Sequence, residues 1–386
     1  MPNDLGPIRT RRIYYISGFD PRGARYYHRL YRDEAVRQAA TAGFEVQVGA
    51  RGVGAGRDAA WSVRADWPDG QSVRSDYRFL AWDDIIRRHW ERSPWRVLAN
   101  GLVGYRRYIG GGAFARLKRS HRGALFSGLF PIVFLALWAV LVACALAAGA
   151  TAGRLLAPGW VGATGTALVL GGGALWLGRV LGDRLGLFWL LRTYLFVEEW
   201  GAVGCPLLEE RIDRFAAQIA RDQEAAPVDE VLLVGHSVGA VIAAAVASRW
   251  VRRQGGGAVP LKLLTLGQCV PLLAFIPQAE AFRREVADLV VDGRVAWFDV
   301  TAKVDPLCFH AVNPAVVCDA PATAPGMTIM HNARFFRMFR PQTYRRLRRD
   351  KLRLHFQYLM STELETGYDY FRITAGPRPL GLALEP

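Results

Sequence analysis

Two long stretches without a charged residue most constrain how this chain can fold. The residues from Ala124 to Gly149, and again those from Gly159 to Gly178, contain no Asp, Glu, Lys or Arg and are mostly apolar. A helix needs about 20 apolar residues to cross a hydrocarbon core of roughly 30 Å. The short link between the stretches carries one charge, Arg154. The sequence therefore predicts helices over about 124–149 and 159–178 that form a transmembrane hairpin.

Basic residues on both sides of this hairpin predict its orientation. They are Arg106, Arg107, Arg116, Lys118, Arg119 and Arg122 before it, and Arg179, Arg184 and Arg192 after it. The positive-inside rule then places both flanks in the cytoplasm, at the inner membrane if the cell is bacterial. The alternative is a buried helix pair in a soluble core. We disfavour it because such core helices have apolar stretches of only about 10–14 residues.

The remaining chain alternates short apolar strands with helical segments. The predicted strands are Ile13–Ile16, Phe44–Val48, Val231–Val234, Leu261–Leu266, Val295–Val300 and Met327–Met330, with a hairpin formed by Trp61–Ala65 and Val73–Tyr77. This rhythm predicts an α/β fold with a mostly parallel sheet and helices on both faces. We expect residues 1–100 and 198–386 to build this one domain, and residues 101–197 to be the membrane insertion.

A five-residue motif follows the continuous apolar run Val231–Val234. It reads Gly235-His236-Ser237-Val238-Gly239, a G-x-S-x-G sequence, and it opens the small-residue helix Ala240–Val251. A strand, a tight turn and a helix in this order are the setting of a nucleophile elbow, in which glycines let the strand and the helix approach closely. Ser237 is the predicted nucleophile. The structural alternative is a serine that only caps the helix.

The elbow and its setting resemble the α/β-hydrolase superfamily, over both pieces outside the membrane segment. The resemblance implies a triad in the chain order serine, acid, histidine. Asp305 follows the strand Val295–Val300, whereas Asp299 lies within it. For the base, His355 is favoured and His331 is the alternative, while His310 lies too close to Asp305 for another strand between them. A packed or surface histidine in a basic helix is the other interpretation of His355.

The resemblance also implies an oxyanion hole made of backbone N–H groups. One donor is Val238, which follows the nucleophile. The other comes from the loop after the first strand, where the sequence is Ser17-Gly18-Phe19-Asp20 and Phe19 N–H is the candidate. Ser17 stands where the family usually has a histidine.

No motif for a metal ion, a nucleotide or another cofactor is found, and none is expected. The net charge of +15 is compatible with a nucleic-acid partner, but the charge gathers at the membrane flanks and near the C-terminus without a recognisable binding motif. We therefore expect a membrane-anchored serine hydrolase that cleaves an ester or related acyl bond of a hydrophobic or lipid substrate. The alternative is a non-catalytic, hydrolase-like membrane scaffold or binding module. The oligomeric state stays open.

Overall fold

The computed structural model describes residues 6–54, 56–112, 115–116, 122–156, 160–253, 259–365 and 367–385. The chain divides into two compact units. The first unit comprises Met1–Trp90, Arg107–Ala124 and Phe196–Pro386, and the second comprises Glu91–Arg106 and Leu125–Leu195. The first unit is therefore built from segments that the second unit interrupts in sequence.

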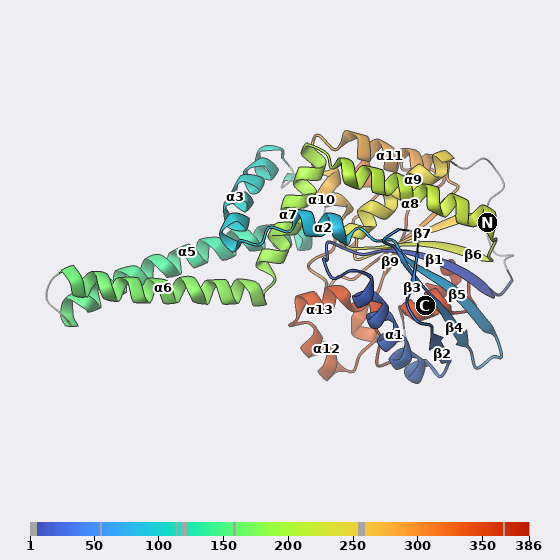
Figure 1. The fold of residues 1–386 in the computed structure, drawn as a ribbon, viewed down its shortest axis with the longest axis horizontal. Helices are drawn as coiled ribbons and strands as arrows, with labels where there is room; N and C mark the ends of the chain where they lie inside the picture. The colour runs from blue at the N-terminus through green and yellow to red at the C-terminus, as the bar shows by residue number, and fades with distance from the viewer. Residues whose placement is uncertain are drawn as a thin grey trace. The chain divides into compact units, whose positions relative to one another are not determined.

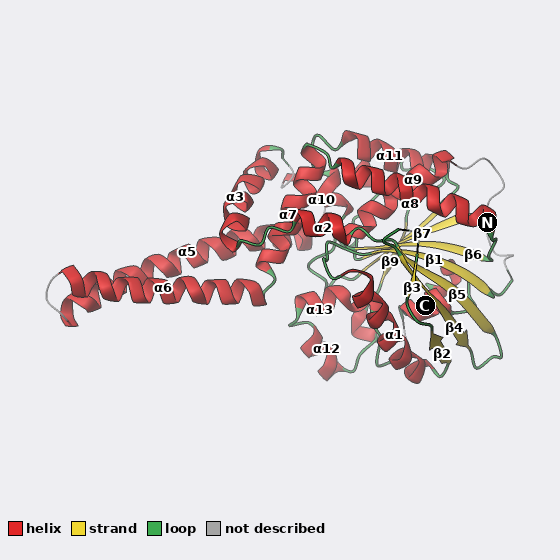
Figure 2. Ribbon diagram, viewed as in Figure 1, coloured by secondary structure: helices red, strands yellow, loops and turns green. Residues whose placement is uncertain are grey.

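The described part of the first unit contains a nine-stranded sheet with the order β2-β4-β5-β1-β6-β7-β8-β9, and β3 pairs with β4 (Figure 2). The predicted strands and the predicted hairpin are all present, with slightly different ends. The bounds are β1 Thr10–Ile16, β2 Glu45–Val48, β3 Gly52–Val53, β4 Ala59–Asp66, β5 Ser72–Phe79, β6 Glu230–His236, β7 Leu261–Leu266, β8 Ala296–Thr301 and β9 Ile329–Asn332.

The expectation of a mostly parallel sheet is wrong, because the sheet is mixed. Strands β5, β1, β6, β7, β8 and β9 run parallel to their neighbours in that series. On the other side, β4 is antiparallel to β2, β3 and β5. The short turn through Pro68-Asp69-Gly70 reverses the chain between β4 and β5, and a connection this short can join only antiparallel strands.

Helices cover both faces of the sheet, as predicted (Figure 1). Alternate residues of β1 point to opposite sides, so Tyr14 and Ile16 join one core cluster while Ile13 and Tyr15 join the other. The first cluster includes α2 (Asp83–His89), α8 (Pro206–Ala225), α9 (Val238–Arg253), α10 (Val270–Ala274) and α11 (Glu280–Asp292). The second includes α1 (Gly23–Ala42), α12 (Pro341–Leu347), α13 (Lys351–Phe356), α14 (Tyr370–Ala375) and α15 (Leu380–Ala383).

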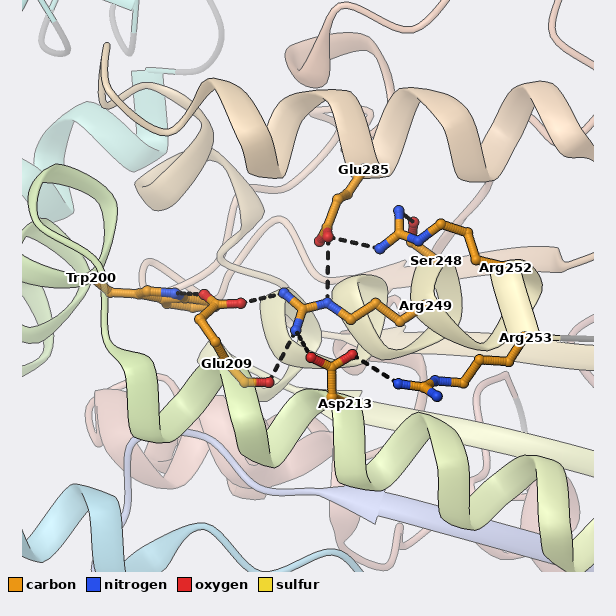
Figure 3. Close-up of polar contacts among 8 residues, drawn as sticks. All are labelled: Trp200, Glu209, Asp213, Ser248, Arg249, Arg252, Arg253 and Glu285. Atoms are coloured by element: carbon orange, nitrogen blue, oxygen red, sulfur yellow. Dashed lines mark hydrogen bonds and ion pairs between the residues drawn. The ribbon is translucent and has the colours of Figure 1, made fainter.

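A network of ion pairs joins α9, the helix that follows Ser237, to its neighbours (Figure 3). The guanidinium of Arg249 contacts Glu209 and, at 3.1 Å, Asp213 of α8, and at 3.3 Å it contacts Glu285 of α11. Trp200, near the end of α7 (Leu187–Ala202), donates its indole N–H to Glu209 over 2.8 Å. Only 12% of the Arg249 side chain is exposed, so this charge depends on its carboxylate partners.

We expect Arg249→Met to lower the free energy of unfolding by roughly 1–3 kcal/mol, because three carboxylates then lose their common cation. The cost stays below that of a fully buried pair, since the carboxylates are partly exposed and screened. Chemical unfolding followed by circular dichroism measures the difference. Arg252→Met is the matched control: this side chain is 48% exposed and its loss is expected to cost less than about 0.5 kcal/mol. Equal costs for the two variants would contradict a central role for Arg249.

The second unit contains two helices that are long and apolar enough to cross a membrane, α5 (Arg122–Leu156) and α6 (Trp160–Arg184). The two helices lie side by side as a hairpin (Figure 1). The second unit also contains most of α3 (Pro94–Gly110) and the first half of α7. Both helices extend beyond the predicted ranges. The predicted helices ended at Gly149 and Gly178, whereas the helices of the structure continue through Arg154 and through Arg179 and Arg184. Arginine is a good helix former.

Glycines bring the two helices of the hairpin close together. A Cβ on Gly149 would lie 2.6 Å from the Ala167 Cα, and a Cβ on Gly153 would overlap the backbone of Gly162. The indole N–H of Trp138 donates to the Ala174 carbonyl over 3.1 Å. Backbones can approach this closely only where side chains are absent, as is common between helices in membranes. Of the glycines of α6, Gly162 and Gly171 face α5, whereas a Cβ added to Gly165, Gly172 or Gly173 would meet nothing within 4 Å.

Candidate active site

Loops from four neighbouring parallel strands meet at the carboxyl edge of the sheet. Gly18 follows β1, Ser237 follows β6, Cys269 follows β7 and Asp305 follows β8. Carboxyl ends of adjacent parallel strands share one edge, and open α/β sheets place their ligand sites there. The pairing of β1 with both β5 and β6 therefore brings the loop Ser17–Asp20 beside the elbow.

Ser237 occupies a strained backbone position between β6 and α9. Its φ is +58°, in the left-handed region of backbone conformation that residues other than glycine rarely adopt. The turn is tight because its glycines leave no room for a side chain. A Cβ on Gly239 would lie 2.5 Å from the Ser17 carbonyl oxygen, and one on Gly235 would lie 2.5 Å from the Gly239 carbonyl oxygen. A serine with positive φ at a tight strand-to-helix turn is the backbone geometry that a nucleophile elbow requires.

Asp305 and His355 form a buried pair. The distance from His355 Nδ1 to Asp305 Oδ2 is 2.8 Å, and neither side chain is more than 1% exposed. Tyr358 donates its hydroxyl to the same oxygen over 3.1 Å, and Leu307 N–H donates to Oδ1 over 3.0 Å. Since Nδ1 faces the carboxylate, the neutral imidazole carries its proton on Nδ1. Nε2 is then left as a proton acceptor.

The carboxylate of Asp305 stays ionised although it is buried. Burial alone raises the pKa of this carboxyl group, but the charge of His355 and the hydrogen bonds from His355, Leu307 and Tyr358 outweigh burial and hold the pKa below its ordinary value. Tyr358 is itself fixed by the backbone, because Ala302 N–H donates to its hydroxyl over 2.8 Å. The acid is therefore charged and immobile, as an orienting partner of an imidazole must be.

His236, the second residue of the G-x-S-x-G motif, contacts the backbone of His355. The distance from His236 Nε2 to the His355 carbonyl oxygen is 2.9 Å, and the two rings are 4.8 Å apart. His236 is 1% exposed. Burial is the main cause that lowers the pKa of His236 to about 3, and the electrostatic interaction with the neighbouring His355 ring acts in the same direction. His236 is thus neutral, and its Nε2–H donates the hydrogen bond.

This buried histidine predicts acid sensitivity of the fold. Between pH 6.5 and about 3 the unfolded chain binds a proton at His236 that the folded chain does not, so stability falls as the pH falls. At pH 4 the loss from this residue is on the order of 3 kcal/mol. His236→Gln keeps an N–H donor and removes the titration. We expect the free energy of unfolding to fall more between pH 7 and pH 4 in the natural chain than in His236→Gln. If the two chains lost the same free energy of unfolding over this range, the lowered pKa of His236 would be contradicted.

The hydroxyl of Ser237 is enclosed by the neighbouring loops. Its Oγ lies 3.7 Å from Cys269 Sγ, and a Cβ on Gly18 would lie 2.9 Å from the Ser237 Cβ. Ser237 is 3% exposed. Within the described residues, His355 Nε2 has no hydrogen-bond partner, so Ser237 and His355 are not hydrogen-bonded to each other here. Catalytic hydrogen bonds of this kind are often loose without substrate and tighten when it binds.

Of the other predicted site residues, Phe19 and Val238 lie next to Ser237, and His331 lies on β9. Phe19 directly follows Gly18 and so belongs to the loop beside Ser237, while Val238 is the first residue of α9. His331 lies on β9 and stacks on Phe298 with 6.1 Å between ring centroids, and burial lowers its pKa. The contacts of the Asp305 carboxylate within the described chain go to His355, Tyr358 and Leu307, and none goes to His331.

Two further candidates from the sequence have contacts of their own. Asp299 lies within β8, as predicted, and its Oδ1 accepts the Thr265 hydroxyl over 2.6 Å. Burial raises the pKa of Asp299 to about 7. His310 Nδ1 lies 3.1 Å from the Thr301 hydroxyl. Neither residue contacts the Asp305–His355 pair through a described hydrogen bond.

Sequence reasoning missed the roles of His236, Cys269 and Tyr358. His236 lies inside the G-x-S-x-G motif, but the motif defines only its neighbours. Cys269 has a usable signal, since it closely follows a predicted strand at the edge where sites form. Tyr358 has no such signal, because its bond to Asp305 joins residues 53 positions apart. Within the described residues, no group of three His, Cys, Asp or Glu side chains could hold a metal ion.

Comparison with family models, with curated proteins and with solved structures finds no match to this chain. The geometry of the site therefore carries the functional argument.

Proposed function

We propose that this protein is a membrane-anchored serine hydrolase that cleaves an ester or related acyl bond through an acyl-serine intermediate. The observation that carries the proposal is the combination of two features at one sheet edge. Ser237 has a φ of +58° at a strand-to-helix turn, and a buried Asp305 holds His355 at 2.8 Å. The resemblance of the motif to the elbow of α/β-hydrolases supports the same function.

In the proposed reaction, Ser237 Oγ attacks the acyl carbonyl carbon while His355 Nε2 takes the hydroxyl proton. Asp305 orients the imidazole and stabilises the imidazolium that forms. The negative charge on the carbonyl oxygen is met by the N–H groups of Val238 and Phe19. His355 then gives the proton to the departing alcohol, which leaves an acyl ester on Ser237. A water molecule, deprotonated by His355, attacks this ester, and His355 returns the proton to Ser237 Oγ as the acyl–oxygen bond breaks and the carboxylic acid leaves.

The membrane hairpin supports a hydrophobic acyl substrate. Many of its large apolar side chains are exposed, among them Leu137 at 66% and Val169 at 73%. A pair of core helices buries such side chains, whereas helices in lipid do not. A hydrolase held at the bilayer meets acyl lipids at high local concentration, which favours an ester of a long acyl chain as substrate.

A fluorophosphonate probe tests the serine chemistry directly, since it labels activated serines. We expect it to label the natural chain in membranes and to leave Ser237→Ala unlabelled. Labelling should be blocked by long-chain esters more strongly than by short-chain esters. A natural chain that resists labelling would instead favour the alternative, a non-catalytic scaffold or binding module with the same fold.

The proposed orientation has its own test. With both flanks of the hairpin in the cytoplasm, reporters fused to either terminus should behave as cytoplasmic in a bacterial host, and a reporter inserted next to Arg154 should behave as periplasmic. The physical reason is the excess of arginine outside the hairpin. A cytoplasmic signal at Arg154, together with release of the protein by a salt wash, would contradict a spanning hairpin.

A further inference from the structure

More than half of the net positive charge lies in one short segment. Residues 334–353 contain nine lysines and arginines and a single acid, Asp350, and so carry eight of the fifteen net positive charges of the chain. The segment lies outside the membrane flanks. It forms the 3-10 helix η2 (Phe335–Arg337), α12 and the start of α13.

Most of these basic side chains are exposed, and they lie on elements that contact one another. α12 contacts both η2 and α13, while Met338, Leu347 and Leu354 point into the core. The exposed cations define what we call the basic face: Arg334, Arg337, Arg340, Arg345, Arg346, Arg348, Arg349 and Lys351. Arg345 and Arg346 lie in the last turn of α12, and Arg348 and Arg349 directly follow it.

Acids do little to neutralise this surface. Asp350 accepts the N–H of Arg353 as the N-cap of α13, and Glu363 accepts the N–H of Arg340 and the hydroxyl of Thr343. Within the described residues, Arg345, Arg346 and Arg349 form no ion pair with a carboxylate. These three cations can therefore meet an external anion.

An aromatic side chain stands among these cations. Phe336 is 57% exposed, and the guanidinium of Arg337 lies 5.9 Å from its ring centroid. Arginines around an exposed aromatic ring suit a bilayer interface, where the charges meet phosphates and the ring enters the headgroup layer. The hairpin of the same chain supplies the proximity, because a tethered surface meets the membrane at high effective concentration.

We propose that the basic face docks on anionic phospholipid headgroups. The docking rests on the membrane attachment in the proposed function and not on the serine chemistry. Since α13 begins at Lys351 and carries His355, a docked basic face brings the histidine end of the site to the headgroup layer. The site then faces the surface from which an acyl lipid enters.

The test uses the full chain in lipid nanodiscs, with the environment-sensitive dye NBD attached at Gln342→Cys on α12 and the exposed Cys144 changed to Ala. Copurification with nanodiscs of neutral phosphatidylcholine reports the hairpin alone. Adding phosphatidylglycerol is expected to raise NBD emission several-fold, to shift it to the blue and to slow its reduction by dithionite by about fivefold or more, as the attraction to anionic lipid predicts. High salt should reverse all three changes.

A matched pair of variants separates this docking from general charge. The first removes Arg345, Arg346, Arg348 and Arg349, and the control removes the exposed Arg29, Arg51, Arg57 and Arg74, in each case by change to Gln. We expect the lipid response to be lost in the first variant and kept in the control, with unchanged circular dichroism in both. Equal responses in the two variants overturn the proposal. So does a labelled DNA or RNA duplex that binds the basic face in neutral nanodiscs while phosphatidylglycerol leaves NBD unchanged.

Discussion

Ser237→Ala is expected to lower turnover of an acyl ester by on the order of 10⁶, and His355→Ala by a similar factor. The double variant should be little worse than either single variant, because nucleophile and base act as one unit. Asp305→Asn should cost only about 10⁴ to 10⁵, since it spoils the orientation and charge stabilisation of the imidazole without removing the base. Steady-state hydrolysis of a chromogenic ester by the membrane-bound protein measures all four variants.

The same series distinguishes the two candidate bases. His331→Ala is the matched control, because His331 lies on β9 and Asp305 bonds to His355. We expect this control to keep its activity. Loss of activity in His331→Ala with retention in His355→Ala would move the base to His331 and leave the hydrolase proposal intact. Full turnover by Ser237→Ala on every ester tested would end the hydrolase proposal itself.

Gly239→Ala is expected to damage both stability and activity. The added methyl group would overlap the carbonyl oxygens of Ile16 and Ser17, which belong to β1 and the loop that follows it. These backbone atoms cannot move aside as a flexible side chain can. Overpacking of this kind costs roughly 3 kcal/mol. The helix would also be pushed away from the loop that carries Phe19, so labelling of Ser237 by a fluorophosphonate should fall with the stability.

Gly110→Ala is the control for this change, because nothing lies within 4 Å of a Cβ at Gly110 and its φ is not positive. It removes a glycine from a helix without creating an overlap, and its unfolding free energy should change by less than about 1 kcal/mol. Thermal unfolding and probe labelling of both variants give the comparison. A Gly239→Ala variant as stable and as reactive as Gly110→Ala would mean that the elbow is looser than described.

The sequence predicted the strands well because burial on both faces leaves a strong signal. β6 contains the continuous apolar run Val231–Val234, and four of the six residues of β7 are leucines. Both strands were placed within about two residues, the usual uncertainty of strand ends. The antiparallel hairpin of β4 and β5 was predicted, but the antiparallel pairing of β2 and β3 with β4 was not. A βαβ rhythm indicates parallel neighbours, and β3 (Gly52–Val53) is too short to show a periodicity.

The parts of the candidate site that directly follow a strand in the sequence could be predicted. Ser237 follows a buried strand and Asp305 follows another, and local sequence shows both. The contacts that fix His355 do not follow from local sequence. Tyr358 lies on the 3-10 helix η3 (Gln357–Leu359) directly after α13, and its bond to Asp305 joins residues 53 positions apart. The bond from His236 to the His355 carbonyl joins residues 119 positions apart. Such long-range contacts depend on tertiary packing, which one sequence does not display.

The place of β6 in the sheet imposes an order on how this protein is made. β1 lies between β5 and β6, and both α5 and α6 separate β5 from β6 in the chain. During synthesis β1, β4 and β5 emerge first, and one edge of β1 stays open until the apolar helices have left the ribosome. Folding of the hairpin shortens the loop that must then close, which lowers its entropic cost. The strained turn at Ser237 therefore forms late, because β6 and the turn after it are synthesised only after both apolar helices.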